Sequence, residues 1–134
     1  MFLLDTNVVS ESRKPRPNPG VVDWLTTQPA AALFICAFTI GELQAGVEKT
    51  RRQDPTKAAE IESWIDQIVN TNAVLPMDTD AFRIWAKLIA QQSATVRDDA
   101  LIAACAKSHG LTVVTRDVKH FQLFGVPFVN PFSE

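Results

Sequence analysis

The sequence has few cysteines and no long apolar run. Its two cysteines, Cys36 and Cys105, each stand alone in an apolar stretch, where a buried thiol is more common than a disulfide or a metal ligand. No apolar run approaches the roughly 18 residues that a membrane-spanning helix needs. The sequence does not open with the charged and then apolar pattern of a secretory leader, because the acidic Asp5 interrupts the first apolar residues. We therefore expect a soluble, cytoplasmic protein.

The sequence also lacks a strong charge of either sign. Its 13 basic and 15 acidic residues give a net charge of -2, which neither favours nor excludes a nucleic-acid partner. Basic residues cluster within positions 13–16 and 49–52. Such clusters can meet phosphates, although solvated surface charge is the more common reason for them.

An apolar content of 46% is sufficient for the core of one compact domain over residues 1–134. Short apolar runs predict strands at 1–4, 33–37, 73–76 and 111–115, with a short fifth at 127–129. Helical patterns lie between them, at about 18–28, 39–47, 57–68, 78–89 and 98–109. This alternation predicts an α/β fold whose central parallel sheet of four to five short strands is flanked by helices.

Acidic residues follow two of the expected strands. Asp5 ends the first strand in the segment LLDTN, and Asp117 ends the fourth in the segment VVTRD. In open α/β sheets the ligand site lies beyond the carboxyl ends of the strands, so these two acids are the first candidates. Taken singly, Asp5 is equally well interpreted as a helix cap before Val8, and Asp117 as a turn residue.

Two further acids belong to expected helices. Glu42 closes the segment TIGE, a capping box in which the glutamate returns to the backbone N–H of Thr39, and taken alone this interpretation is preferred. Asp98 and Asp99 stand in the first turn of a helix, where the helix dipole favours negative charge. Asp99 begins the apolar run DALIAACA, so we expect it to point inward, with Asp98 facing solvent.

The four acids together favour a metal site. Carboxylates that converge at one sheet edge repel each other unless a divalent cation neutralises them. Oxygen ligands select a hard cation, Mg²⁺ or Mn²⁺, and no histidine or cysteine has a spacing that favours zinc. His109 at a helix end and His120, without an evident acidic partner, are expected to be non-catalytic. The predicted metal ligands and catalytic residues are Asp5, Glu42, Asp99 and Asp117.

A cation held in this way predicts phosphodiester hydrolysis. It would coordinate a phosphodiester oxygen and lower the pKa of a bound water. We therefore expect cleavage of RNA or DNA by a metal-bound water, oriented by Asp99 or Asp117. Asn7 and Thr115 are expected to hydrogen-bond the ligand carboxylates or the water, with ordinary turn and strand-end chemistry as the alternative.

Four ordered segments resemble the PIN-domain family, specifically VapC-type toxins of its FitB-like branch. They are LDTNV at 4–8, TIGEL at 39–43, DALIAA at 99–104 and VTRD at 114–117. Each is weak alone, but in this order they cover nearly the whole chain. The resemblance implies a PIN-like fold. By their positions in the matching segments, Asp5, Glu42, Asp99 and Asp117 correspond to the four acidic residues of the family's active site. The last position often varies in the family, so Asp117 is expected either to bind the metal or to assist without binding it.

The resemblance also implies a function and partners. A protein of this kind is a Mg²⁺- or Mn²⁺-dependent endoribonuclease and the toxin of a type II toxin–antitoxin pair. It acts on RNA, forms a homodimer, and is silenced by a small cognate antitoxin that inserts a segment into the active-site groove. Composition and spacing show none of these partners.

Three competing protein classes match parts of the sequence. A phosphoacceptor receiver domain would use Asp78, but it needs paired acids after the first strand and a late lysine. A haloacid-dehalogenase phosphatase needs an aspartate where Asn7 stands. The class that remains as an alternative is a non-enzymatic nucleic-acid- or antitoxin-binding module whose carboxylates only cap helices. The acidic set argues against a simple phosphate-binding surface, because it repels the nucleic-acid backbone.

Overall fold

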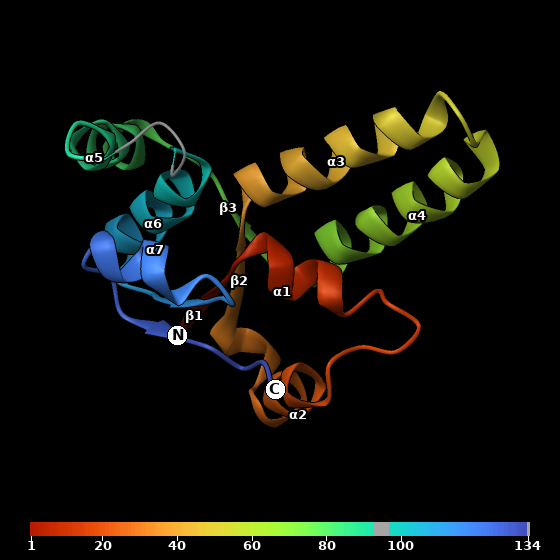
Figure 1. The fold of residues 1–134 in the computed structure, drawn as a ribbon, viewed down its shortest axis with the longest axis horizontal. Helices are drawn as coiled ribbons and strands as arrows, with labels where there is room; N and C mark the ends of the chain where they lie inside the picture. The colour runs from red at the N-terminus through yellow and green to blue at the C-terminus, as the bar shows by residue number, and fades with distance from the viewer. Residues whose placement is uncertain (93–96, 134) are drawn as a thin grey trace.

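Strands and helices alternate along the chain in the computed structural model, which describes residues 1–92 and 97–133 (Figure 1). The elements are β1 (Phe2–Leu4), α1 (Thr6–Glu11), α2 (Pro19–Thr27), the 3₁₀ turn η1 (Ala30–Ala32), β2 (Leu33–Cys36), α3 (Ala37–Arg51), α4 (Pro55–Thr71), β3 (Ala73–Leu75), α5 (Thr79–Ile89), α6 (Arg97–His109), β4 (Thr112–Val114), α7 (Val118–Leu123) and β5 (Phe128–Val129).

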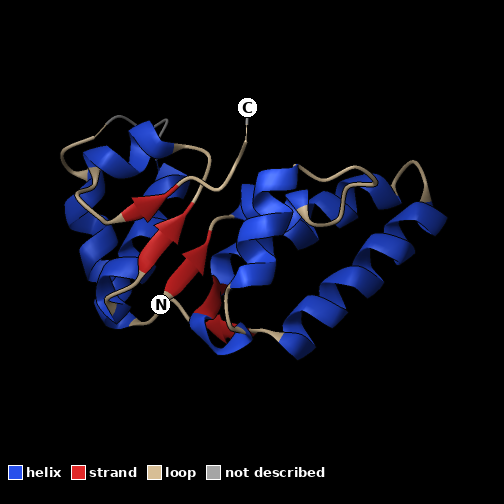
Figure 2. Cartoon of the chain, turned by 90° about the horizontal axis from the view of Figure 1, so that it is seen from below, coloured by secondary structure: helices blue, strands red, loops and turns tan. Residues whose placement is uncertain are grey.

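The five strands form one sheet in the order β3-β2-β1-β4-β5, and every neighbouring pair is parallel (Figure 2). The predicted α/β fold with a parallel sheet is confirmed. Strand β1 is central, with Leu3 paired to Phe34 on one side and to Val113 on the other. The chain moves outward from β1 to β2 and β3, and then returns to the other side of β1 with β4. This reversal of strand order lies between β1 and β4, where open α/β sheets leave a crevice for a ligand.

Each face of the sheet has its own apolar core because successive side chains of a strand point to opposite faces. Leu3 and Val113 pack with residues of α5, α6 and α7. Leu4 and Val114 pack on the other face, with residues of α1 to α4. The first of these cores also holds Cys36 and Cys105, both free and buried as predicted. No helix of the described residues is long and apolar enough to cross a membrane.

Local signals define several helix ends. The side chain of Asn18 accepts hydrogen bonds from the first N–H groups of α2, and that of Asp78 accepts from Ala81 N of α5. Gly110 follows α6 with a φ of +66°, a conformation that glycine adopts without a steric penalty. These three predicted boundaries are confirmed.

Two local predictions are wrong. Helix α3 begins at Ala37, two residues before the expected cap, so Thr39 lies inside the helix and the capping box of Glu42 does not form. Helix α7 was not predicted, because its six residues are too few to show a clear apolar period. Both differences change the surroundings of the candidate site, since Glu42 is freed for another partner and α7 carries His120.

Candidate functional site

Asp5 follows β1 directly and lies at the crevice between β1 and β4. Its carboxylate caps α1 by accepting from Thr6 N at 2.8 Å, and it also accepts from Thr115 Oγ1 at 2.7 Å. The residue is only 4% exposed. Burial raises the pKa of Asp5 to about 6, the two hydrogen bonds oppose the rise, and the charges of Asp99 and Asp117 add to it. Asp5 is therefore both the predicted helix cap and a buried carboxylate with acidic neighbours.

Asn7 and Thr115 connect Asp5 to Asp117. The Asn7 amide donates to Asp117 Oδ2 at 3.2 Å and to Asp5 Oδ2 at 3.4 Å. The backbone N–H of Asp117 donates to Thr115 Oγ1 at 2.9 Å, and Thr115 is fully buried. Both residues thus take part in hydrogen bonds that connect the acids after β1 and β4.

Glu42 lies in the second turn of α3 and turns toward α1. Its Oε1 accepts from Thr6 Oγ1 at 2.6 Å, while the same hydroxyl lies 3.1 Å from Thr39 Oγ1. Burial raises the pKa of the half-buried Glu42 carboxyl, and the charges of Asp98 and Asp99 contribute. Thr6 therefore connects Glu42 to Asp5, and within residues 1–92 and 97–133 no hydrogen bond to Glu42 Oε2 is formed.

Asp99 lies in the first turn of α6 and points inward, whereas Asp98 is exposed, as expected. The imidazole Nδ1 of His120 hydrogen-bonds Asp99 Oδ2. Burial raises the pKa of Asp99, the contact with His120 lowers it, and Asp117 and Asp98 raise it further.

The expectation that His120 lacks an acidic partner is wrong. Ligand atoms of Asp99, Asp117 and His120 all lie within 4.8 Å of one another. One sequence signal could have indicated this: His120 follows Asp117 by three residues, so a helix starting at Asp117 turns both to one side. This group contains neither Asp5 nor Glu42. Asp5 is connected to the group by hydrogen bonds of Asn7, and Glu42 is connected to Asp5 by Thr6.

The donors suit a hard divalent cation. Carboxylate oxygens dominate the set. The pKa values of Asp5, Glu42 and Asp99 are all raised, first by burial and to a smaller extent by the charges of neighbouring carboxylates. Hydrogen bonds from Thr6, Thr115 and Asn7 hold oxygens of Asp5, Glu42 and Asp117 in place. The group of Asp99, Asp117 and His120 adds an imidazole to these oxygens.

A hollow of about 380 Å³ extends from the site between α1, α3 and α4. Thr6 and Glu42 form its end next to the carboxylates, and Trp64 of α4 lines it farther out. The guanidinium carbon Cζ of Arg13 lies 5.8 Å from the centre of the Trp64 ring. The site is thus open to a ligand much larger than a metal ion.

The fold and the order of these acids agree with a known family. A family model described as PIN domain matches residues 2–124. The chain belongs to the PIN-domain family. This PIN domain is similar to the VapC ribonuclease Y4jK of Sinorhizobium fredii, with 34% identity over 144 residues and 99% of each chain covered. It is also similar to toxin FitB of Neisseria gonorrhoeae, with 33% identity over 141 residues and full coverage of both chains.

A solved structure supports the same assignment. The PIN domain superposes on the crystal structure of FitAcB from Neisseria gonorrhoeae with a TM-score of 0.87 and 34% identity, over 98% of each chain. The resemblance to VapC and FitB toxins that the four sequence segments carry is therefore confirmed, together with the PIN-like fold.

Proposed function

We propose that this PIN domain is a Mg²⁺- or Mn²⁺-dependent endoribonuclease and the toxin of a type II toxin–antitoxin pair. The observation that carries the proposal is the group of Asp99, Asp117 and His120, whose ligand atoms lie within 4.8 Å of one another. Asp5 is connected to this group by Asn7, and Glu42 is connected to Asp5 by Thr6. The names of the two relatives, a VapC ribonuclease and a toxin, support the same reaction. The proposed metal ligands and catalytic residues are Asp5, Glu42, Asp99 and Asp117.

The residues of the site have different roles in the proposed reaction. When bound, the cation supplies Lewis-acid activation of the phosphodiester and of water. Asp5 and Asp99 would hold the cation, and Glu42 would contribute a carboxylate oxygen. Thr115 and Asn7 orient the carboxylates by hydrogen bonds, and His120 orients Asp99. Asp117 would hold the cation or accept a proton from the attacking water.

The proposed partners are RNA, a cognate antitoxin and a second copy of the chain, in the cytoplasm. The hollow next to Glu42 is large enough to hold a peptide side chain or a nucleotide beside the metal. An antitoxin segment that enters this hollow would exclude RNA from the carboxylates, which is the inhibition that the family resemblance implies.

The test is cleavage of a mixed RNA pool by the purified chain with Mg²⁺, Mn²⁺ or excess EDTA. Asp5→Asn removes one buried carboxylate at constant shape, and Asp66→Asn makes the same change on the exposed surface of α4. We expect metal-dependent cleavage by the wild type and by Asp66→Asn, and its loss in Asp5→Asn. Mn²⁺ should also raise the Tm of the first two proteins more than that of Asp5→Asn, because a cation bound by the folded state stabilises it.

The alternative is a binding module without catalysis. If folded, metal-loaded and antitoxin-free protein cuts no RNA, and Mn²⁺ shifts all three Tm values equally, the nuclease proposal is wrong. Retained RNA or antitoxin binding under those conditions would establish the binding module instead.

A further inference from the structure

A second hollow, of about 240 Å³, lies on the outer side of Asp117. It is lined by Arg116, Asp117, Val118, Lys119 and His120. Two cations and one carboxylate give this wall a net positive charge, directly beside a site that is otherwise acidic. Among residues 1–92 and 97–133, neither Arg116 nor Lys119 is in an ion pair.

The guanidinium of Arg116 is held in a defined position. Its Cζ lies 4.8 Å from the centre of the Phe132 ring, a cation–π contact. Such a contact uses the face of the planar guanidinium and leaves its N–H edge open. That edge is the part of arginine that binds phosphate with two parallel hydrogen bonds.

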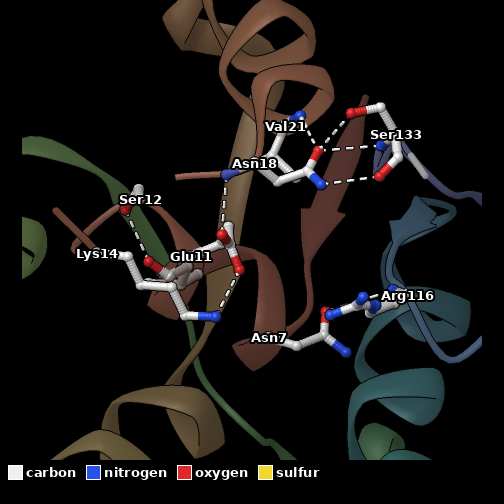
Figure 3. A network of polar contacts seen from close by, with 9 residues as sticks. Asn7, Glu11, Ser12, Lys14, Asn18, Val21, Arg116 and Ser133 are labelled. Carbon is white, nitrogen blue, oxygen red and sulfur yellow. Dashed lines mark hydrogen bonds and ion pairs between the residues drawn. The ribbon is translucent and has the colours of Figure 1, made fainter. Parts of the chain in front are cut away.

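The backbone of Arg116 is tied to the carboxylates. Its N–H donates to Asn7 Oδ1 at 3.4 Å (Figure 3). The Asn7 amide nitrogen donates to Asp117 Oδ2 at 3.2 Å. One asparagine therefore contacts both the acid at the proposed metal site and the residue that carries the cation. A displacement of Arg116 relative to Asp117 would break one of these two hydrogen bonds.

The C-terminal segment 130–133 supports Phe132 by binding to the start of α2. Asn18 Nδ2 donates to Ser133 O at 2.8 Å, and Ser133 N donates to Asn18 Oδ1 at 3.0 Å, as Figure 3 shows. Gly20 permits this approach, because a Cβ on it would lie 2.4 Å from Pro131 O. The tail is thus fixed on both sides of the ring on which Arg116 rests.

Two cations of the other basic clusters are paired with carboxylates, whereas Arg13, Arg16, Lys49 and Arg52 are in no ion pair among the described residues. Lys14 lies 2.9 Å from Glu11, and Arg51 is paired with both Glu48 and Glu62. Their positive charge is largely offset by these carboxylates. Arg116 and Lys119 are both exposed and lie next to Asp117 in the chain and in the hollow.

We infer that the hollow lined by Arg116 and Lys119 binds a backbone phosphate of the RNA strand, and that the tail segment 130–133 positions Arg116 for it. The inference rests on the proposed ribonuclease function. A phosphate held here would set the strand across the carboxylates, with the neighbouring phosphodiester over the metal site. Arg116 is then a substrate-binding residue, and Phe132 is a positioning residue.

The experiment measures binding of a short fluorescein-labelled, mixed-sequence single-stranded RNA by anisotropy, in EDTA so that no metal-dependent cleavage occurs. Arg116→Gln is compared with Arg52→Gln, which removes the same charge at the tip of the α3–α4 hairpin. We expect Arg116→Gln to weaken binding about tenfold, as loss of a charged hydrogen bond does. The slope of log affinity against log salt should fall by about 0.7, the value for one phosphate contact on a single strand. Arg52→Gln should change neither quantity.

Two variants at Phe132 test the positioning role. Phe132→Tyr keeps the aromatic face, and Phe132→Leu keeps only the apolar volume. We expect Phe132→Leu to weaken RNA binding about threefold, the worth of an exposed cation–π contact, while Phe132→Tyr binds as the wild type does. A thermal melt of each variant verifies that the domain is folded.

Failure of this inference is distinct from failure of the nuclease proposal. If Arg116→Gln binds RNA with wild-type affinity and salt slope, the phosphate site is wrong, whether or not the chain cuts RNA. If binding depends on Arg116 but the wild type cuts nothing with Mg²⁺ or Mn²⁺, the phosphate site stands and the nuclease proposal fails. Equal effects of Arg116→Gln and Arg52→Gln would overturn the site in favour of diffuse electrostatic attraction.

Discussion

The hydroxyl of Thr115 donates a 2.7 Å hydrogen bond to the carboxylate of Asp5, across 110 residues of sequence. The same hydroxyl accepts from the backbone N–H of Asp117. One fully buried oxygen therefore links the ends of β1 and β4, the two strands between which the sheet reverses its order. This link fixes the separation of two proposed metal ligands before any metal binds.

Thr115→Val removes this link at nearly constant volume. The charged carboxylate of Asp5 loses a hydrogen-bond donor, and the backbone N–H of Asp117 loses its acceptor. We expect the free energy of unfolding to fall by about 1–3 kcal/mol, the usual cost of unsatisfied buried groups, measured by urea denaturation. Thr115→Ser keeps the hydroxyl and should restore most of the loss. Equal destabilisation by valine and serine would mean that packing, rather than the hydrogen bonds, is responsible.

Stability of the metal-free protein should depend on the ionisation of Asp5. The folded-state pKa of about 6 lies above the ordinary value of 3.8, so the folded state disfavours the charged carboxylate. The contribution of Asp5 is fully favourable below pH 3.8 and is lost as the pH rises through about 6. The full difference is about 3 kcal/mol at 1.36 kcal/mol per pH unit.

The measurement is urea unfolding in EDTA across this pH range, with wild type and Asp5→Asn in parallel. Asparagine cannot ionise, so the difference between the two proteins should shift in favour of the variant as the pH rises. A pH-independent difference would show that the Asp5 carboxylate is not destabilised by burial. Saturating Mn²⁺ should reduce the shift, because a cation favours the charged carboxylate.

Gly20→Ala should loosen the C-terminal tail. A Cβ at this position would lie 2.4 Å from Pro131 O and 2.7 Å from Ser133 N, and both are backbone atoms that must move. We expect a loss of about 1–3 kcal/mol, typical of overpacking, and faster proteolysis of the C-terminus. Gly46→Ala is the matched control within α3, where a Cβ meets nothing within 4 Å. It should stabilise the helix by about 0.5–1 kcal/mol, and a loss at Gly46 as large as at Gly20 would contradict the steric cause.

His120→Ala should weaken binding of Mn²⁺, because it removes the hydrogen-bond partner that orients Asp99. Loss of such a partner usually lowers metal affinity about 10- to 100-fold. Isothermal titration with Mn²⁺ gives the affinity directly. His109→Ala, at the opposite end of α6, serves as the control and should leave it unchanged. Unchanged or tighter binding in His120→Ala would exclude an orienting role for this histidine.

Much of the fold could be predicted because its signals are local. Apolar runs predicted all five strands to within about two residues, a usual error for such boundaries. Side chains that contact their own backbone, such as Asn18 and Asp78, could be assigned as caps from sequence alone. Asp5 and Asp117 were found by the same reasoning, since the acid after a parallel strand lies at the carboxyl edge of the sheet whatever the rest of the chain does.

The sequence by itself therefore determined the strands, the five longer helices between them and the position of two acids at the sheet edge. Tertiary structure decided the partners of the other two. Glu42 meets Thr6 from 36 residues away, and Asp99 meets His120 from 21 residues away. The sequence around Glu42 also matched a local capping box, so its contact with Thr6 could not be predicted. The contact of Asp99 with His120 depends on α7, which is too short to show a helical pattern of apolar residues. Such contacts follow from how helices pack against the sheet, and that packing is set by the whole core rather than by neighbouring residues.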